Sequence, residues 1–360
     1  FGVSMSEIKE LVEISKYAGE RFDLVQAGGG NSSVKYDNDE MIIKASGFLL
    51  SDVNIDSGYS KVITSKIANI VKNETIQNSK EKRERESLTS QLVKDATLDK
   101  QNRPSIETLL HSFLYKYTLH THPVVVNMIV VQKNWKEILK NIFVDETIAM
   151  VEYKTPGIEL ALALNSELKK FETIPNIIFL QNHGLIVTST HKQEIKTMTE
   201  QVLTKIEKYL KIDMCKYKIT NDITYLLNTI EKNANISYLS EDSYLNEQLL
   251  KNKELFFYTP FCPDSLVYCG ISCCEIDDVF DVMSLENYKE KYFELPKVVI
   301  FENKLFFIAQ NIKKGKEMEE VMKFHIIVLE QNKKNDKTFL EVEELAYLDN
   351  WEAEKFRKKI

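Results

Sequence analysis

The chain has 360 residues, a length that suits two domains better than one. An apolar content of 43% and a charged content of 28% are ordinary for a soluble globular protein, and the formal charge of -7 argues against a nucleic-acid partner. Because no apolar stretch reaches the length of a membrane span and no signal-peptide core is present, we expect no membrane association.

The first hundred residues predict a helix, a hairpin and a charged segment. Apolar spacing predicts a helix over residues 5–20, and a β-hairpin is expected in the glycine-rich run that follows. Residues 60–71 have a helical pattern. The charged segment 72–103 is expected to be either a solvated helical face or a mobile insert. Pro104-Ser105 then opens a helix in which Ser105 is the N-cap.

The middle of the chain predicts alternating strands and helices. The sequence LHTHP, residues 119–123, lies in a predicted strand. Helices are expected over 135–150 and 158–171. Residues 176–189 read as two strands around a tight Asn-His-Gly turn, and residues 191–210 predict a long helix.

A change of composition marks the second domain. Residues 216–250 are polar and rich in Asn and Ser, and we expect them to link a first domain, 5–215, to a second domain, 251–360. We expect no internal repeat and no low-complexity tract. The elements expected in the second domain are strands over 266–270, 297–301 and 305–310, a helix from about 315 to 332 and a final helix from about 350.

The five cysteines are clustered late in the chain and form no CxxC pair. We expect reduced thiols in a cytoplasmic protein rather than a disulfide framework. A cysteine zinc site within residues 269–274 is a disfavoured alternative, because the spacing is not that of known sites.

Two of the six histidines, His120 and His122, are one residue apart in an apolar run. Side chains alternate along a strand, so both imidazoles would share one face. A metal ion and a pair of buried polar side chains explain this pattern equally well. His183 favours the metal, because its Asn-His-Gly turn can expose a third imidazole, and three histidines with an open position are typical of catalytic zinc. His191 and His325 are expected to be ordinary surface or interface histidines.

Glu107 lies in the first turn of the helix that precedes the HxH strand. A glutamate there usually interacts with the helix dipole. The helix leads directly into the strand, however, so the carboxylate can lie near the metal, move protons or fill the open coordination position. His111 is four residues further on, and it either joins this site by a hydrogen bond or is satisfied within the helix packing.

Two short glycine motifs have the character of an anion site. GGGNSS, residues 28–33, and ASG, residues 45–47, supply small side chains, hydroxyls and backbone N–H groups. Ser33 stands where the GxGxxG dinucleotide pattern needs glycine, and no P-loop follows. A turn is the more frequent reason for a triple glycine. No GxSxG elbow indicates serine hydrolysis.

Six motifs that follow one another within residues 28–185 resemble the class II (zinc-dependent) aldolase/adducin family: GGGNSSVK, KASG, PSIETLLH, HTHP, YKTPG and QNHGL. The nearest resemblance is to the aldolase part of bifunctional rhamnulose-1-phosphate aldolase/alcohol dehydrogenases, and it continues more weakly into the tail. It implies an α/β fold, an α/β/α sandwich around a mostly antiparallel sheet, and assembly as a homotetramer. We expect the C-terminal region to be a smaller α+β domain.

The resemblance also implies a site and a reaction. His120, His122 and His183 correspond to the zinc ligands, and Glu107 corresponds to the catalytic acid/base, which approaches the metal when substrate is absent. The implied reaction cleaves or forms a C–C bond in a ketose phosphate, giving dihydroxyacetone phosphate and an aldehyde through a zinc-stabilised enediolate. The residues that correspond to the family's phosphate site are Gly30, Asn31, Ser46, Gly47 and Ser105.

Some features depart from the family pattern. Ser105-Ile106 replaces the two serines that precede the glutamate in fuculose-phosphate aldolases, and Lys44 either compensates for the lost contact or is a solvated strand lysine. We expect no nicotinamide role, because the chain reaches Ile360 without a Rossmann fingerprint. The alternative functions are an epimerase, dehydratase or decarboxylase at the same metal site, and a catalytically dead adducin-like interaction module.

Overall fold

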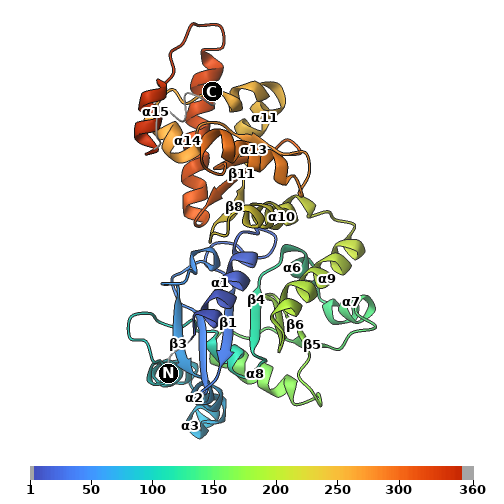
Figure 1. The fold of residues 1–360 in the computed structure, drawn as a ribbon. Helices are drawn as coiled ribbons and strands as arrows, with labels where there is room; N and C mark the ends of the chain where they lie inside the picture. The colour runs from blue at the N-terminus through green and yellow to red at the C-terminus, as the bar shows by residue number, and fades with distance from the viewer. Residues whose placement is uncertain (1–3, 351–360) are drawn as a thin grey trace. The chain divides into compact units, whose positions relative to one another are not determined.

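The computed structural model describes residues 4–350, and the chain divides after Met214 into two compact units, called unit 1 and unit 2 here. The strands of unit 1 are β1 (Asn31–Tyr36), β2 (Glu40–Lys44), β3 (Tyr59–Ile63), β4 (Tyr117–Thr121), β5 (Ile148–Val151), β6 (Ile177–Leu180) and β7 (Gly184–Ser189). They form one sheet of order β3-β2-β1-β4-β7-β6-β5 (Figure 1). Every neighbouring pair is antiparallel except β5 and β6.

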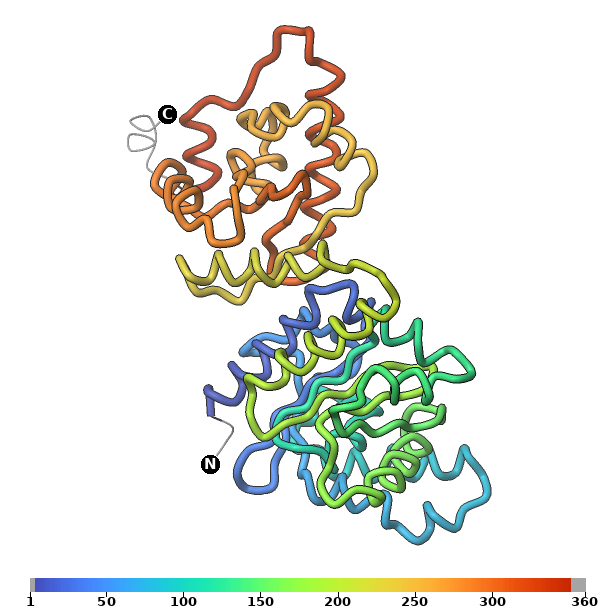
Figure 2. The backbone as a smooth tube through the Cα atoms, turned by 90° about the vertical axis from the view of Figure 1, so that its right-hand side faces the viewer, coloured from blue at the N-terminus to red at the C-terminus, as the bar shows by residue number. Residues whose placement is uncertain are grey.

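Helices cover both faces of this sheet. One face carries α1 (Met5–Gly19), η1 (Leu50–Asp52), α6 (Val124–Val130), α7 (Trp135–Ile142) and α9 (Lys192–Leu210). The other carries α2 (Thr64–Ala68), η2 (Asn69–Lys72), α3 (Glu74–Asn78), α4 (Lys82–Asp95), α5 (Thr108–Ser112) and α8 (Ile158–Leu168). Figure 2 shows α1 and α9 side by side on one face. The predicted α/β/α sandwich around a mostly antiparallel sheet is confirmed.

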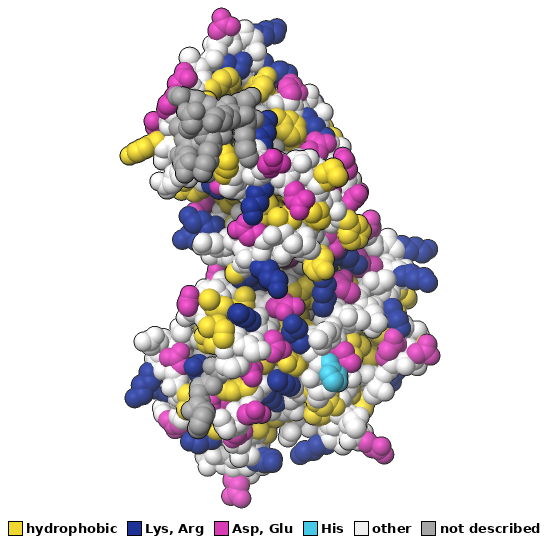
Figure 3. All heavy atoms as spheres, viewed as in Figure 1, with side chains coloured by type: hydrophobic (Ala, Val, Ile, Leu, Met, Phe, Trp, Pro, Cys, Tyr) yellow, Lys and Arg dark blue, Asp and Glu magenta, His cyan; other side chains and the backbone are white. Residues whose placement is uncertain are grey.

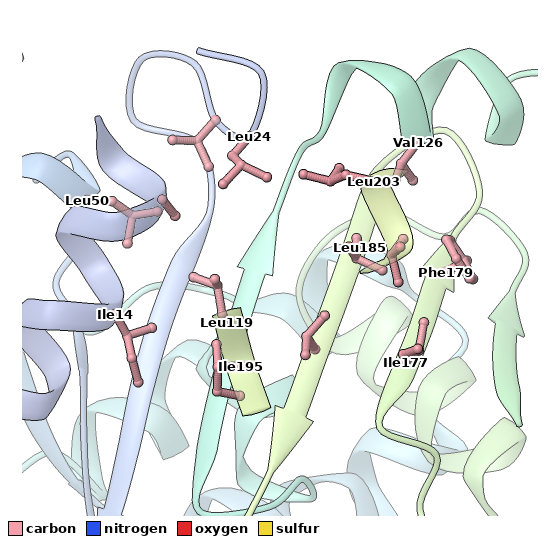
Figure 4. Close-up of a cluster of buried hydrophobic side chains, with 14 of the residues drawn as sticks. Ile14, Leu24, Leu50, Leu119, Val126, Ile177, Phe179, Leu185, Ile195 and Leu203 are labelled. Atoms are coloured by element: carbon pink, nitrogen blue, oxygen red, sulfur yellow. The ribbon is translucent and has the colours of Figure 1, made fainter. Parts of the chain in front are cut away.

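The alternation of side chains along each strand separates two hydrophobic cores. Leu119, Phe179 and Leu185 point to the face that α1, α6 and α9 cover (Figure 4). Ile178 and Ile186 point to the opposite face, against α5 and α8. His120 follows Leu119 in β4 and therefore points toward the α5 side, where Glu107 lies.

Several predicted elements of unit 1 differ from those observed. Residues 60–71, expected to be helical, begin within β3 and continue as α2 and η2. The predicted strand over 119–123 ends at Thr121, and the apolar run after Pro123 forms the helix α6, in which tertiary packing outweighs the low helix propensity of valine. Residues 135–150 divide into α7 and β5. The charged segment 72–103 is helical in α3 and α4 and irregular over 96–103, and Arg85 of α4 forms an ion pair with Glu159 of α8.

Unit 2 is the smaller α+β domain that the sequence predicts. Its strands are β8 (Ile236–Leu239), β9 (Cys274–Glu275), β10 (Val298–Phe301) and β11 (Lys304–Ala309), in the order β8-β11-β10-β9. Its helices are α10 (Cys215–Ile230), α11 (Ser243–Lys251), η3 (Lys253–Phe257), α12 (Pro263–Cys269), α13 (Val282–Tyr292), α14 (Ile312–Gln331) and α15 (Val342–Leu348).

Two expectations for this region are wrong. Residues 216–250 are not a linker: they form most of α10, all of β8 and most of α11, and Ile223 and Leu226 of α10 are buried in the core of unit 2. Residues 266–270 are not a strand but the end of α12, which begins with proline at its first position. The predicted final helix from about residue 350 lies outside the described residues.

Unit 2 repeats the strand connections of half of unit 1, although the sequence itself shows no internal repeat. The series β4-β7-β6-β5 pairs as antiparallel, antiparallel and parallel, and β8-β11-β10-β9 pairs in the same way. A long helix follows in each case, α9 or α14. Leu239 lies opposite Phe306 as His120 lies opposite Ile186, so the repeat keeps the fold without the histidine.

Within residues 4–350 no helix combines the length and the hydropathy needed to cross a membrane. On the face shown in Figure 3, basic and acidic side chains are interspersed, without a broad area of one sign. This mixed surface matches the modest net charge of -7.

Candidate metal centre

The three predicted metal ligands meet where the central strand β4 ends and its neighbour β7 begins, in the sheet of unit 1. His120 lies in β4, and His183 lies in the turn between β6 and β7. His122 follows β4, and its backbone N–H donates to the carbonyl of Leu24. The Nε2 atom of His120 is 3.2 Å from the Nε2 atoms of both His122 and His183. Antiparallel pairing of β4 with β7 brings these distant parts of the sequence together. Within residues 4–350 they form one cluster of ligand atoms less than 4.8 Å apart.

The orientation of the rings suits a metal ion. The Nδ1 atom of His120 lies 3.0 Å from the carbonyl oxygen of Leu185, so the N–H donates there and the Nε2 lone pair points to the centre. The nitrogens of a tetrahedral site with bonds of about 2.0 Å are separated by about 3.3 Å, close to the spacing observed here. These three histidines therefore fit a divalent cation and leave one position of a tetrahedral site open.

Close backbone approach explains the glycines around the histidines. A Cβ atom on Gly184 would lie 2.2 Å from the carbonyl oxygen of Thr121, so only glycine allows β7 to pass β4 at this point. A Cβ atom on Gly29 would lie 2.7 Å from Nδ1 of His122. By contrast, a Cβ atom on Gly28 would meet nothing within 4 Å. The glycine loop thus packs directly against His122, one of the candidate metal ligands.

We expect Gly29→Ala to weaken metal binding by roughly 10- to 100-fold, because the added methyl group displaces the His122 ring from its position. Gly28→Ala is the matched control, and it should bind metal as the unchanged chain does. Titration of both variants with a divalent metal in competition with a chelator measures the difference. Equal affinities would show that the loop does not position His122.

Glu107 completes the centre. It is the N-cap of α5 and is 8% exposed. Its Oε1 atom lies 3.1 Å from Nε2 of His183, and its Oε2 atom lies 3.4 Å from Nε2 of His120. The helix begins at Thr108, not at Ser105 as expected, and the N–H of Glu107 donates to Oγ of Ser105 at 3.3 Å. The carboxylate therefore sits against the same nitrogens that converge on the centre.

A chain of hydrogen bonds holds Glu107 in place. The amide of Asn31 donates to Oε2 of Glu107 at 2.7 Å, and the other end of this amide contacts Nε2 of His111. Nδ1 of His111 lies 2.6 Å from Oγ of Ser33. Asn31 stands directly opposite His120 in the β1–β4 pairing, so the two side chains share a face. His111 thus belongs to the outer part of the site.

The charges of the site are strongly coupled. Burial alone would raise the pKa of Glu107, but His120 and His183 hold it well below its usual range. Burial opposes charge on His120, yet Glu107 raises the pKa of that imidazole. Burial and the neighbouring His120 and His183 lower the pKa of His122 to about 3. Burial likewise lowers the pKa of His111 to about 3, so this ring is neutral. The carboxylate is ionised, and it is the one negative group among these side chains.

The residues predicted to hold phosphate are not equivalent in the structure. Gly30 and Gly47 have positive φ angles of 76° and 86°, which favour glycine. Ser46 and Gly47 are exposed at the ASG turn. Ser105 is partly buried next to Glu107. The side chain of Asn31 is already bonded to Glu107, a role that the sequence did not reveal.

Lys44 joins the two glycine motifs and is not a solvated strand lysine. It is 4% exposed, and its Nζ atom donates to the carbonyl of Phe48 at 2.7 Å and approaches that of Gly28 at 3.5 Å. Burial lowers its pKa, and Glu107 partly opposes this effect. A buried cation therefore lies between the glycine loop and the ASG turn.

The other histidines and the cysteines lie apart from this centre. His191 is exposed at the N-terminus of α9, as expected. His325 is buried in unit 2 instead, with Nδ1 3.0 Å from Oγ of Ser265. Cys269, Cys273 and Cys274 are buried, and burial raises the pKa of Cys269 to about 12. Within residues 4–350 no group of three or more possible metal ligands includes a cysteine.

Comparison with known proteins gives a family model that covers more than half of the chain. The family model described as the class II aldolase and adducin N-terminal domain matches residues 9–210. An uncharacterized oxidoreductase of Bacillus subtilis, YuxG, is 26% identical over 212 residues, which are 56% of this chain and 29% of YuxG. The chain thus spans less than a third of that relative.

The chain is also similar to solved structures. The N-terminal class II aldolase domain of a conserved protein from Thermoplasma acidophilum is 24% identical, with a TM-score of 0.49, over 58% of this chain and 96% of that one. A sugar-phosphate aldolase from Thermotoga maritima is 14% identical, with a TM-score of 0.39, over 57% of this chain and 94% of that one.

Proposed function

This chain belongs to the class II aldolase and adducin family, and we propose that it is a zinc-dependent lyase acting on a ketose phosphate. The reaction is reversible cleavage of a C–C bond to dihydroxyacetone phosphate and an aldehyde. One observation carries the proposal: the buried carboxylate of Glu107 lies 3.1 Å and 3.4 Å from two of the three imidazole nitrogens that converge at the centre. We also propose that the protein is a homotetramer and cytoplasmic, and that its nearest relatives are the rhamnulose-1-phosphate aldolases.

The three histidines would hold the metal ion. When bound, a divalent cation polarises the substrate carbonyl and stabilises the negative charge that bond cleavage leaves behind. Zinc is proposed because three neutral imidazoles with an open position are its usual catalytic environment. The hydrogen bond from Nδ1 of His120 to the carbonyl of Leu185 keeps that ring in its orientation.

Glu107 is the proposed acid/base. In the cleavage direction it delivers a proton to the carbon that becomes the hydroxymethyl group of dihydroxyacetone phosphate, and in the synthetic direction it removes that proton. Asn31 fixes the carboxylate by a 2.7 Å hydrogen bond, so that it stays directed at the substrate position. Gly30, Asn31, Ser46, Gly47 and Ser105 are proposed to surround the phosphate, and Lys44 supplies positive charge behind them.

Proton exchange tests this proposal without knowledge of the aldehyde. We expect the metal-loaded protein to exchange one hydroxymethyl proton of dihydroxyacetone phosphate for deuterium in D2O, as followed by proton NMR. The exchange should be lost when the metal is removed with a chelator and should return when zinc is added. A metal-loaded protein that catalyses no exchange would contradict the assigned chemistry of Glu107.

A further inference from the structure

Two short segments lie side by side at the mouth of the proposed phosphate site. Ala45 and Pro104 form an isolated antiparallel bridge, and the N–H of Ser46 donates to the carbonyl of Arg103 at 2.7 Å. The side chains of Ala45 and Pro104 are buried. Because side chains alternate along extended backbone, Ser46 and Arg103 point away from the core on the same side. Both residues are exposed.

The charge of Arg103 has no partner within residues 4–350: none of their side chains forms an ion pair with its guanidinium, and no hydrogen bond from it is found there. The arginines that the fold uses for structure are paired, as Arg21 is with Asp23 and Arg85 with Glu159. Arg103 therefore carries an unpaired charge on a backbone segment that is hydrogen-bonded to Ser46, next to Gly47 of the proposed phosphate site.

We infer that Arg103 binds the substrate phosphate directly, an inference that rests on the proposed function. The planar guanidinium can donate two parallel hydrogen bonds to a phosphomonoester dianion, which a serine hydroxyl cannot do. Ile106, which stands where the family pattern has a second serine, has no side-chain hydrogen-bond donor to offer a phosphate. Arg103 reaches the phosphate from the open side, whereas Lys44 lies buried behind the glycine loop. The site thereby selects phosphorylated over unphosphorylated sugars.

Binding of inorganic phosphate to the full chain tests this inference without any catalytic readout. Isothermal titration should show Arg103→Ala binding phosphate roughly 10- to 100-fold more weakly than the unchanged chain. Arg103→Lys should have an intermediate affinity for phosphate, because lysine keeps the positive charge but cannot donate two parallel hydrogen bonds as the guanidinium does. Arg83→Ala removes another exposed arginine, from α4, and should bind normally. Unchanged affinity in Arg103→Ala, or no phosphate binding by the unchanged chain, would overturn the inference.

Steady-state kinetics separate this inference from the proposed function. If Arg103→Ala weakens phosphate binding but no ketose phosphate is cleaved by any variant, the inference stands and the lyase proposal fails. If Arg103→Ala cleaves the substrate with an unchanged KM, the lyase proposal stands and the inference fails. If the inference and the lyase proposal are both correct, we expect Arg103→Ala to raise the KM for the phosphorylated ketose at least tenfold. The KM for the unphosphorylated sugar should stay unchanged.

Discussion

A His122→Ala chain is expected to purify without stoichiometric divalent metal and without lyase activity. The Nε2 atom of His122 lies 3.2 Å from that of His120, which lies 3.2 Å from that of His183. Without His122 only two imidazoles remain, which are too few to bind the ion tightly. The loss of affinity should exceed the roughly 10- to 100-fold that removal of an outer partner costs. Elemental analysis of the dialysed protein, by inductively coupled plasma mass spectrometry, measures the metal content per chain.

His191→Ala is the matched control for this experiment. His191 is exposed at the start of α9, so its removal should change neither the metal content nor the activity. Thermal unfolding monitored by circular dichroism shows whether His122→Ala keeps its fold. A folded His122→Ala chain that retains one metal ion would refute the assigned ligands.

We expect Glu107→Gln to reduce kcat by roughly 10²- to 10⁴-fold while the protein keeps its metal. The amide has nearly the same size as the carboxylate but cannot carry the proton. Asn31 can still form a hydrogen bond to the new side chain through its amide. Steady-state cleavage assays and metal analysis on the same preparation separate loss of chemistry from loss of the ion.

Glu152→Gln serves as the control for Glu107→Gln, because Glu152 is an exposed glutamate that pairs with Lys136 on the surface. It should leave kcat unchanged. Full activity in Glu107→Gln would mean that another group moves the proton. Loss of metal from this variant, on the other hand, would make Glu107 a ligand and not an acid/base.

The main alternative to an enzyme is a catalytically dead, adducin-like interaction module. Such a module has no use for three imidazoles arranged around an open position, or for a buried carboxylate whose hydrogen bonds lead from Asn31 to His111 and Ser33. Buried charge is costly unless it serves a purpose, and ionised groups in strongly coupled clusters are concentrated at functional sites. The arrangement therefore favours the enzyme.

The sequence predicts which side chains meet at the candidate centre, because they lie in motifs with local causes. The HxH pair, the Asn-His-Gly turn and the glutamate before the strand each have a physical reason to expose their side chains. Adjacency in space then follows from antiparallel pairing of β4 with β7. The family resemblance adds the order of the motifs, and the match over residues 9–210 agrees with it.

Features that depend on the register between strands distant in the chain could not be predicted from the sequence. The role of Asn31 follows from its position opposite His120, which requires the β1–β4 pairing. The repeat in unit 2 is hidden because it conserves strand order and not chemistry: Leu239 stands where His120 stands in unit 1. Residues 216–250 look like a linker because their exposed faces are polar, while Ile223 and Leu226 are buried.

The most direct test of the lyase is release of dihydroxyacetone phosphate from a panel of ketose 1-phosphates by the zinc-loaded chain. Production of this compound, coupled to glycerol-phosphate dehydrogenase, is followed for the unchanged chain and for Glu107→Gln side by side. The account predicts release from at least one ketose 1-phosphate by the unchanged chain and loss of nearly all of it in Glu107→Gln. Release that is equally fast in both, or conversion of a ketose phosphate to its epimer without any cleavage product, would contradict it.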